Sequence, residues 1–153
     1  MAQLTSEDRD CISDLIILVG MSKELKSEQL NEQQVWQKVN IHLRSGDRQF
    51  MTDDEDDVML CRKPHNEAAT FVEQLEQMLE KKRDEVLFEP SEPSFEISIT
   101  RTKRAGIKVE AWIDAGNGKT GIYTWDAAGV RFYSTDEYLQ KFVTELKKEF
   151  ELD

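Results

Sequence analysis

The chain has 153 residues, of which 39% are hydrophobic, enough for one domain with a hydrophobic core. Its 31 acidic residues against 20 lysine and arginine residues give a formal net charge of −11. A surface this acidic repels the phosphates of nucleic acid and anionic lipid, so we expect neither as a partner, whereas a basic protein is attracted. Solubility alone is the other explanation for such a charge.

We expect one α+β domain over residues 1–153, with residues 1–9 polar and frayed. The amino terminus is acidic, unlike a signal peptide, and the apolar run Leu15–Val19 is too short to cross a bilayer. These features predict a cytoplasmic protein. The two cysteines, Cys11 and Cys61, lack the spacing of a metal site. We expect both to be buried thiols, and a disulfide between them is the alternative.

Residues 11–19 fit either a helical stripe or a buried strand. Their all-round apolar character and β-branched residues favour the strand. We expect residues 21–33 to be a polar connection with room for a helical turn. Residues 35–43 alternate as a second strand, and residues 49–51 follow a turn as a short third one.

Five consecutive carboxylates come next, and like charges in a row cannot pack together, so they predict an exposed loop. These residues are Asp53, Asp54, Glu55, Asp56 and Asp57. A calcium loop starting at Asp53 would need glycine and glutamate where Val58 and Pro64 stand, so no metal site is expected. Val58–Cys61 is a short apolar segment, and Pro64 prevents it from continuing much farther.

The spacing of apolar residues predicts a helix over 66–83, with Asn66 as its cap and basic residues 81–83 closing it. Residues 86–88 read as a short strand, and the two prolines in 89–93 make a stiff link. A last helix follows Ser134, which with Glu137 matches a capping box.

Between these helices, strict alternation and turn residues predict a four-stranded meander at 94–101, 106–114, 119–126 and 130–133. One face carries aromatic and charged residues, a composition typical of protein-binding surfaces. The opposing interpretation is that a helix covers this face and the aromatics belong to the core. The aromatic candidates for partner contact are Trp112, Tyr123 and Trp125.

No catalytic constellation appears in the sequence. The fragment Gly-Asn-Gly-Lys-Thr at 116–120 resembles the end of a phosphate-binding loop, but Ile113 stands where the pattern needs glycine, and a strand follows instead of a helix. His42 and His65 have no nearby nucleophile motif. We therefore expect no enzyme activity and no cofactor.

Two pieces of the chain resemble a known family. Residues 88–97 read Phe-Glu-Pro-Ser-Glu-Pro-Ser-Phe-Glu-Ile, and residues 129–135 read Gly-Val-Arg-Phe-Tyr-Ser-Thr before the last helix. With the order of elements, this is similar to the immunity proteins of cell-wall-associated, WapI-type contact-dependent toxins, over about residues 35–150. The resemblance implies an α+β domain that binds and neutralises a toxin and has no catalytic residues.

The expected fold is thus α+β: an antiparallel sheet of six or seven strands with two main helices. The expected function is that of an acidic, non-enzymatic binding protein, of immunity type, with a basic toxin domain as partner. The alternative is a small-molecule-binding or regulatory protein that uses an aromatic pocket between helix and sheet.

Overall fold

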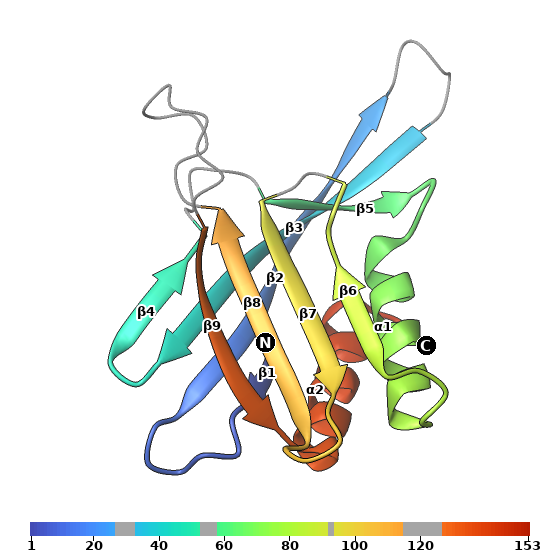
Figure 1. The fold of residues 1–153 in the computed structure, drawn as a ribbon. Coiled ribbons are helices and arrows are strands. Elements are labelled where there is room, and N and C mark those ends of the chain that lie inside the picture. Colours follow the sequence, from blue (N-terminus) through green and yellow to red (C-terminus); the bar gives the residue numbers. More distant parts are fainter. Residues whose placement is uncertain (27–32, 53–57, 92–93, 115–126) are drawn as a thin grey trace.

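The computed structural model describes residues 1–26, 33–52, 58–91, 94–114 and 127–153 (Figure 1). These ranges contain two helices and nine strands, which form antiparallel sheets of five and four strands. The α+β class is confirmed, although the strands are more numerous than expected and divide into two sheets.

The first sheet has the order β1-β2-β3-β4. Strand β5 also pairs with β3, along a different part of β3 from β4. Alternate residues of β3 are buried, as the two-residue period predicts, and β2 confirms the strand at 11–19. The five strands are β1 (Ala2–Thr5), β2 (Ser13–Lys26), β3 (Gln33–Ser45), β4 (Arg48–Met51) and β5 (Met59–Lys63).

Two expectations for this half of the chain are wrong. Residues 2–5 are not frayed, because Ala2 and Leu4 are fully buried and β1 pairs with β2 from Ala2↔Ile17 to Thr5↔Asp14. Residues 21–26 are not a helical connection but continue β2, which pairs with β3 as far as Lys26↔Gln33. In both places pairing with a neighbouring strand decides the conformation.

The second sheet has the order β6-β7-β8-β9, and all its neighbours are antiparallel. The strands are β6 (Glu85–Phe88), β7 (Phe95–Arg101), β8 (Ile107–Asp114) and β9 (Ala127–Ser134). The predicted strand at 119–126 lies outside the described residues. Strands β8 and β9 pair directly with each other, from Ile107↔Ser134 to Asp114↔Ala127.

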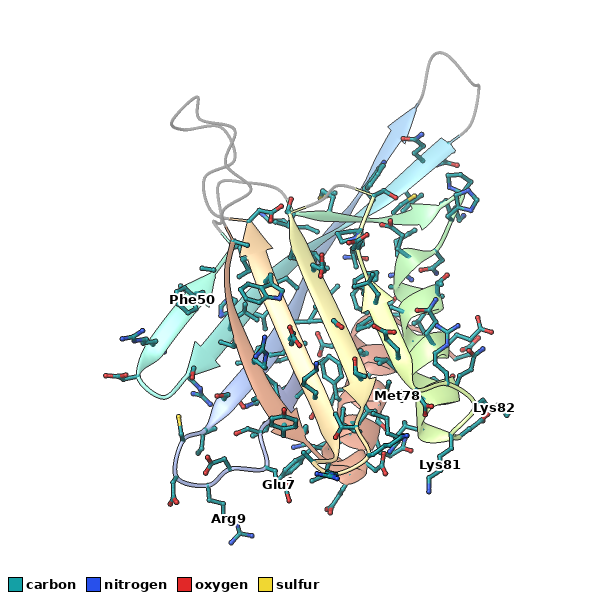
Figure 2. The ribbon with its side chains drawn as sticks, viewed as in Figure 1. Glu7, Arg9, Phe50, Met78, Lys81 and Lys82 are labelled. Atoms are coloured by element: carbon teal, nitrogen blue, oxygen red, sulfur yellow. The ribbon has the colours of Figure 1, made fainter. Side chains whose placement is uncertain are left out.

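Helix α1 (Glu67–Leu79) begins at the predicted cap, where Asn66 Oδ1 accepts a 3.1 Å hydrogen bond from the Ala69 amide. It ends earlier than expected, because Lys81 takes a left-handed conformation with φ 59°. Lys81 and Lys82 therefore project beyond the helix (Figure 2) and do not close it.

Helix α2 (Asp136–Glu149) is capped one residue later than expected. Thr135 Oγ1 accepts a 3.2 Å hydrogen bond from the Tyr138 amide. The predicted cap, Ser134, is instead buried at the end of β9 and donates its hydroxyl to the Thr5 carbonyl oxygen at 2.6 Å. This bond ties the second sheet to β1.

One hydrophobic core contains buried side chains from both sheets and both helices. Helix α2 lies against β1, and α1 lies against α2, β5 and β6. The inner face of the second sheet joins this core through Ile97, Val109, Ala111 and Phe132. Figure 1 looks onto the opposite, outer face of that sheet, with the helices behind and beside it.

Candidate functional site

The outer face of the second sheet is where the sequence places its binding surface. No described helix or strand covers it, so the interpretation that a helix covers this face is wrong (Figure 1). Leu87 on β6 and Tyr133 on β9 are 51% and 43% exposed, although both are large and apolar or aromatic. The face combines such residues with charges, as binding surfaces do. Its central charged and aromatic residues are Glu96, Lys108, Glu110, Trp112 and Arg131.

Glu110 on β8 is a carboxylate with two basic side chains beside it on this face. Its Oε1 lies 3.0 Å from Lys108 Nζ and 3.5 Å from Arg131 Nε, the latter on the neighbouring strand. The hydrogen bond from Lys108, with the charge of Arg131, holds the pKa of Glu110 below its ordinary value, although burial opposes this. These three residues, two basic and one acidic, give this end of the face one surplus positive charge.

Glu96 on β7 has the opposite surroundings. Burial raises the pKa of Glu96, a hydrogen bond with Glu89 raises it further, and the charges of Glu89, Asp114 and Glu110 add to this. Glu89 follows β6, and Asp114 is the last residue of β8, so three adjacent strands of the sheet bring these acids together. The second end of the face therefore carries crowded negative charge.

Trp112 lies between the two ends of the face. Its Cα is paired with Glu96 on β7 and with Gly129 on β9. A Cβ atom at Gly129 would lie 2.6 Å from Trp112 Cε3, so the indole covers the glycine backbone. The side chain is half-buried, as placement on an open sheet face requires.

The other predicted contact residues cannot be placed. Tyr123, Trp125 and the acidic run Asp53–Asp57 lie outside the described residues. The sequence reasoning also missed three members of the face, Glu89, Glu96 and Arg131. Glu96 had a signal, because it alternates with the buried Phe95 and Ile97 and so must point outward.

An open pocket of about 460 Å³ lies beside the same face. It is lined by Ser6 and Cys11 from the loop after β1 and by Arg131 and Tyr133 from β9. The Glu7 amide donates a 2.8 Å hydrogen bond to the Tyr133 carbonyl oxygen, which holds the loop against β9. Figure 2 shows Glu7 near this strand and Arg9 farther out on the loop. This pocket lies between a loop and the sheets, whereas the sequence suggested one between helix and sheet.

Cys11 is exposed in this loop and Cys61 is buried in β5, and both are free thiols. The expectation of two buried thiols is therefore wrong for Cys11. No three metal-binding side chains come together within the described ranges of the chain. Over those same residues, neither helix is long and apolar enough to span a membrane.

Comparison with known proteins identifies a family. The model of the immunity protein WapI-like family matches residues 18–152. No curated protein matches the chain, and no solved structure does. The match takes in eight of the nine strands wholly or in part, both helices, and the whole outer face of the second sheet.

Proposed function

The chain belongs to the WapI-like immunity protein family, and from this premise we propose that it binds a toxin domain and neutralises it by direct contact, without catalysis. The observation that carries the proposal is the family match across residues 18–152. The open, charged and aromatic outer face of the second sheet supports it, because such a surface suits a protein partner.

The partner's charge follows from that of this chain. A net charge of −11 attracts a basic toxin domain and raises the rate of encounter. The run Asp53–Asp57 is the densest negative charge in the sequence and is our candidate for this steering. Trp112, Tyr123 and Trp125 are candidates for the contacts that slow dissociation, because aromatic residues dominate binding energy at interfaces.

The setting of the inhibition follows from the same premise. A protein that protects a cell from a toxin domain entering it must meet that domain inside the cell, so we place the protein in the cytoplasm. Its acidic charge disfavours competing interactions with nucleic acid and with anionic lipid surfaces. The acidic charge thus favours a basic protein as partner over nucleic acid and anionic lipid.

A second candidate function is small-molecule binding. It is favoured by the pocket of about 460 Å³ beside β9, where hydroxyl groups and Arg131 offer polar contacts. Native mass spectrometry of the purified protein tests it. A stoichiometric bound metabolite would support this candidate, and its absence together with toxin binding would reject it.

The experiment for the leading proposal is protection from a toxin. A carboxy-terminal toxin domain, sought among the genes that neighbour the gene of this chain, is expressed in a sensitive host with and without this chain. We expect growth to be restored and the two proteins to copurify at equal stoichiometry. An unrelated toxin domain is the control and should remain lethal. Unrestored growth, or protection without a complex, would overturn direct inhibition.

A further inference from the structure

Strand β9 has one edge without a partner strand. It pairs with β8 on one side, and within the described ranges no strand pairs with its other side (Figure 1). A free edge presents a row of backbone amides and carbonyl groups, to which an extended chain can bind. Because folded proteins usually cover or blunt such edges, an open edge on a strand of eight residues calls for a reason.

The other strand edges of the described chain are better protected. On β1, the Gln3 amide donates a 2.9 Å hydrogen bond to Glu145 Oε2. Strands β5 and β6 lie against helix α1, and β4 has only four residues. Beyond the part that pairs with β1, strand β2 changes register between Val19 and Ser22 and carries two lysines, and both features discourage further pairing. Strand β9 lacks comparable protection over most of its length.

One hydrogen bond shows which backbone groups of β9 face the free edge. The Glu7 amide donates to the Tyr133 carbonyl oxygen at 2.8 Å, so the backbone groups of Tyr133 point away from β8. Because a strand alternates with a period of two, those of Arg131 and Gly129 point the same way. Among the described residues, these two amides and two carbonyl groups have no hydrogen-bond partner. The loop after β1 thus occupies one position of a ladder, and the next two are open.

The first open position lies at the pocket of about 460 Å³, which gives an extended chain room beside β9. Arg131 and Tyr133 line the pocket on the side of β9, and Ser13 and Ser45 line it on the side of the first sheet. Small hydroxyl side chains leave space for a main chain and can hydrogen-bond with it. The Arg131 Nε lies 3.5 Å from Glu110 Oε1 on β8, so this side chain is drawn away from the free edge.

We propose that the pocket binds the main chain of an extended segment of the toxin domain, which pairs with β9 at Arg131 and Gly129 as a fifth strand of the second sheet. The inference rests on the proposed function and identifies the surface and the kind of contact. A main chain fits this edge because the free groups of β9 are donors and acceptors in the order that a ladder needs. A second copy of the chain fits less well, since two molecules of net charge −11 repel each other.

The first test measures amide hydrogen exchange of the free protein by NMR. We expect the Arg131 and Gly129 amides to exchange as rapidly as those of an unstructured peptide, because they lack a partner. The amides of Val130 and Phe132 face β8 and are the internal control, which should exchange more slowly by about a hundredfold or more. Slow exchange at Arg131 would mean that this edge is already covered, which would overturn the proposal.

The second test repeats the exchange measurement in the complex with the toxin domain. The Arg131 and Gly129 amides should become slower by about tenfold or more, since a paired strand supplies their acceptors. Glu85, on the opposite edge of the same sheet, is the control. The Asp84 carbonyl oxygen accepts a bond from the Arg101 amide of β7, so the backbone groups of Glu85 point away from β7 and should keep their exchange rate. A complex that forms without protecting Arg131 would exclude the pocket.

The third test removes an amide donor from the edge by substitution with proline. Arg131→Pro takes no bond from the β8 ladder, and proline is tolerated on an edge whose amide faces outward. We expect it to weaken the dissociation constant for the toxin domain about tenfold, which is about 1.4 kcal/mol. Glu85→Pro is the matched control, because it removes an outward amide and a charge from β6, and it should leave binding nearly unchanged.

Arg131→Ala separates the guanidinium from the amide, because it removes the side chain and keeps the donor. It should bind the toxin domain more tightly than Arg131→Pro does. Equal affinity of these two folded variants would mean that the side chain makes the contact, and equal weakening by Glu85→Pro would mean that the edge is not specific. Either result would overturn the proposal. Melting temperatures show which variants fold, and if Arg131→Pro does not, exchange at Arg131 in the wild-type complex decides.

The toxin domain also separates failure of this inference from failure of the proposed function. If wild type and Arg131→Pro protect cells and bind the toxin domain equally well, the edge of β9 is excluded and immunity stands. If wild type binds no toxin domain, the proposed function fails and this inference fails with it. Loss of affinity in Arg131→Pro, with folding intact and with protection of the Arg131 amide in the wild-type complex, would support the inference.

Discussion

The indole of Trp112 lies across Gly129, its partner on the neighbouring strand β9. A Cβ atom at position 129 would come within 2.3 Å of the Ala111 carbonyl oxygen as well as 2.6 Å of the indole. Because a backbone atom is one of the two obstacles, rotation of the tryptophan alone cannot make room. The glycine therefore sets how closely β8 and β9 approach and where the indole lies.

Gly129→Ala should lower the free energy of unfolding by about 1–3 kcal/mol, because the added methyl group overpacks the strand pair. Chemical denaturation measures this, and NMR of the Trp112 indole should report its displacement. Gly20→Ala on β2 is the matched control, since its nearest neighbour would be the Lys38 Cβ at 3.4 Å. Equal destabilisation of the two variants would contradict this account of Gly129.

Asp14 and Arg44 form an ion pair across β2 and β3, in which Arg44 Nε donates to Asp14 Oδ2 at 2.7 Å. Asp14 is fully buried, whereas the Arg44 side chain is 40% exposed. Arg44→Ala should cost about 3 kcal/mol, because it leaves a buried charge unpaired. Asp14→Ala should cost less, since the freed guanidinium can reach water. Denaturant unfolding tests the order, and a greater cost for Asp14→Ala would contradict it.

Arg101 joins the end of β7 to both helices. Its guanidinium donates to Asp136 at 2.8 and 3.1 Å and to the Met78 carbonyl oxygen at 2.9 Å. The hydrogen bond from Arg101 lowers the pKa of Asp136 from its ordinary 3.8, so the pair stabilises the fold above that pH. This contribution should fade as pH falls through the lowered value.

Asp136→Asn should therefore destabilise the protein at pH 7 and lose its effect in strong acid. Because the Asp136 side chain is 54% exposed, we expect about 1 kcal/mol or less. Melting temperatures of both proteins between pH 7 and pH 2 provide the measurement. A difference that grows as pH falls would have the wrong sign for this ion pair.

The two thiols should react differently. Cys11 is exposed and Cys61 is buried, so a thiol reagent should modify one cysteine of the native protein quickly and the second after denaturation. Mass spectrometry of the peptides identifies the modified residue. Cys11→Ser is the control and should abolish the fast phase. Fast modification of Cys61 in the native state would contradict its burial in β5.

For the acidic run Asp53–Asp57, the prediction about association with the toxin domain rests on the sequence alone. Asp54→Asn with Asp56→Asn and Asp57→Asn should slow association with the toxin domain several-fold while leaving the dissociation rate and melting temperature unchanged. Charge steering acts on encounter, and salt should weaken it because the screening length is about 8 Å at physiological ionic strength.

Removal of three charges elsewhere, with Glu73→Gln, Glu137→Gln and Glu151→Gln, is the matched control for this triple variant. The association and dissociation rates of the two triple variants are measured at two salt concentrations. The run has no part in steering if the association rate ignores both the triple substitution and the salt.

Local pattern was sufficient to predict much of this protein. The alternation Ile107, Val109, Ala111, Ile113 identified β8 and its outward residues, and the spacing in 66–83 identified α1. The sequence also determined the net charge and, by resemblance, the family that the comparison confirmed. Each of these follows from residues close together in the chain, or from composition, which the fold does not alter.

Partnership between strands was decided only by the tertiary structure. A two-residue period tells which face a side chain takes, but it does not tell which strand lies beside it. The pairing of β8 with β9 brings Arg131 to Glu110, and the neighbouring order β6-β7-β8 brings Glu89, Glu96 and Asp114 together. Likewise β1 is an edge strand with Ala2 and Leu4 buried because β2 offers it a ladder, although its own sequence is only four residues long. Long-range hydrogen bonding and burial, which no local pattern encodes, made these choices.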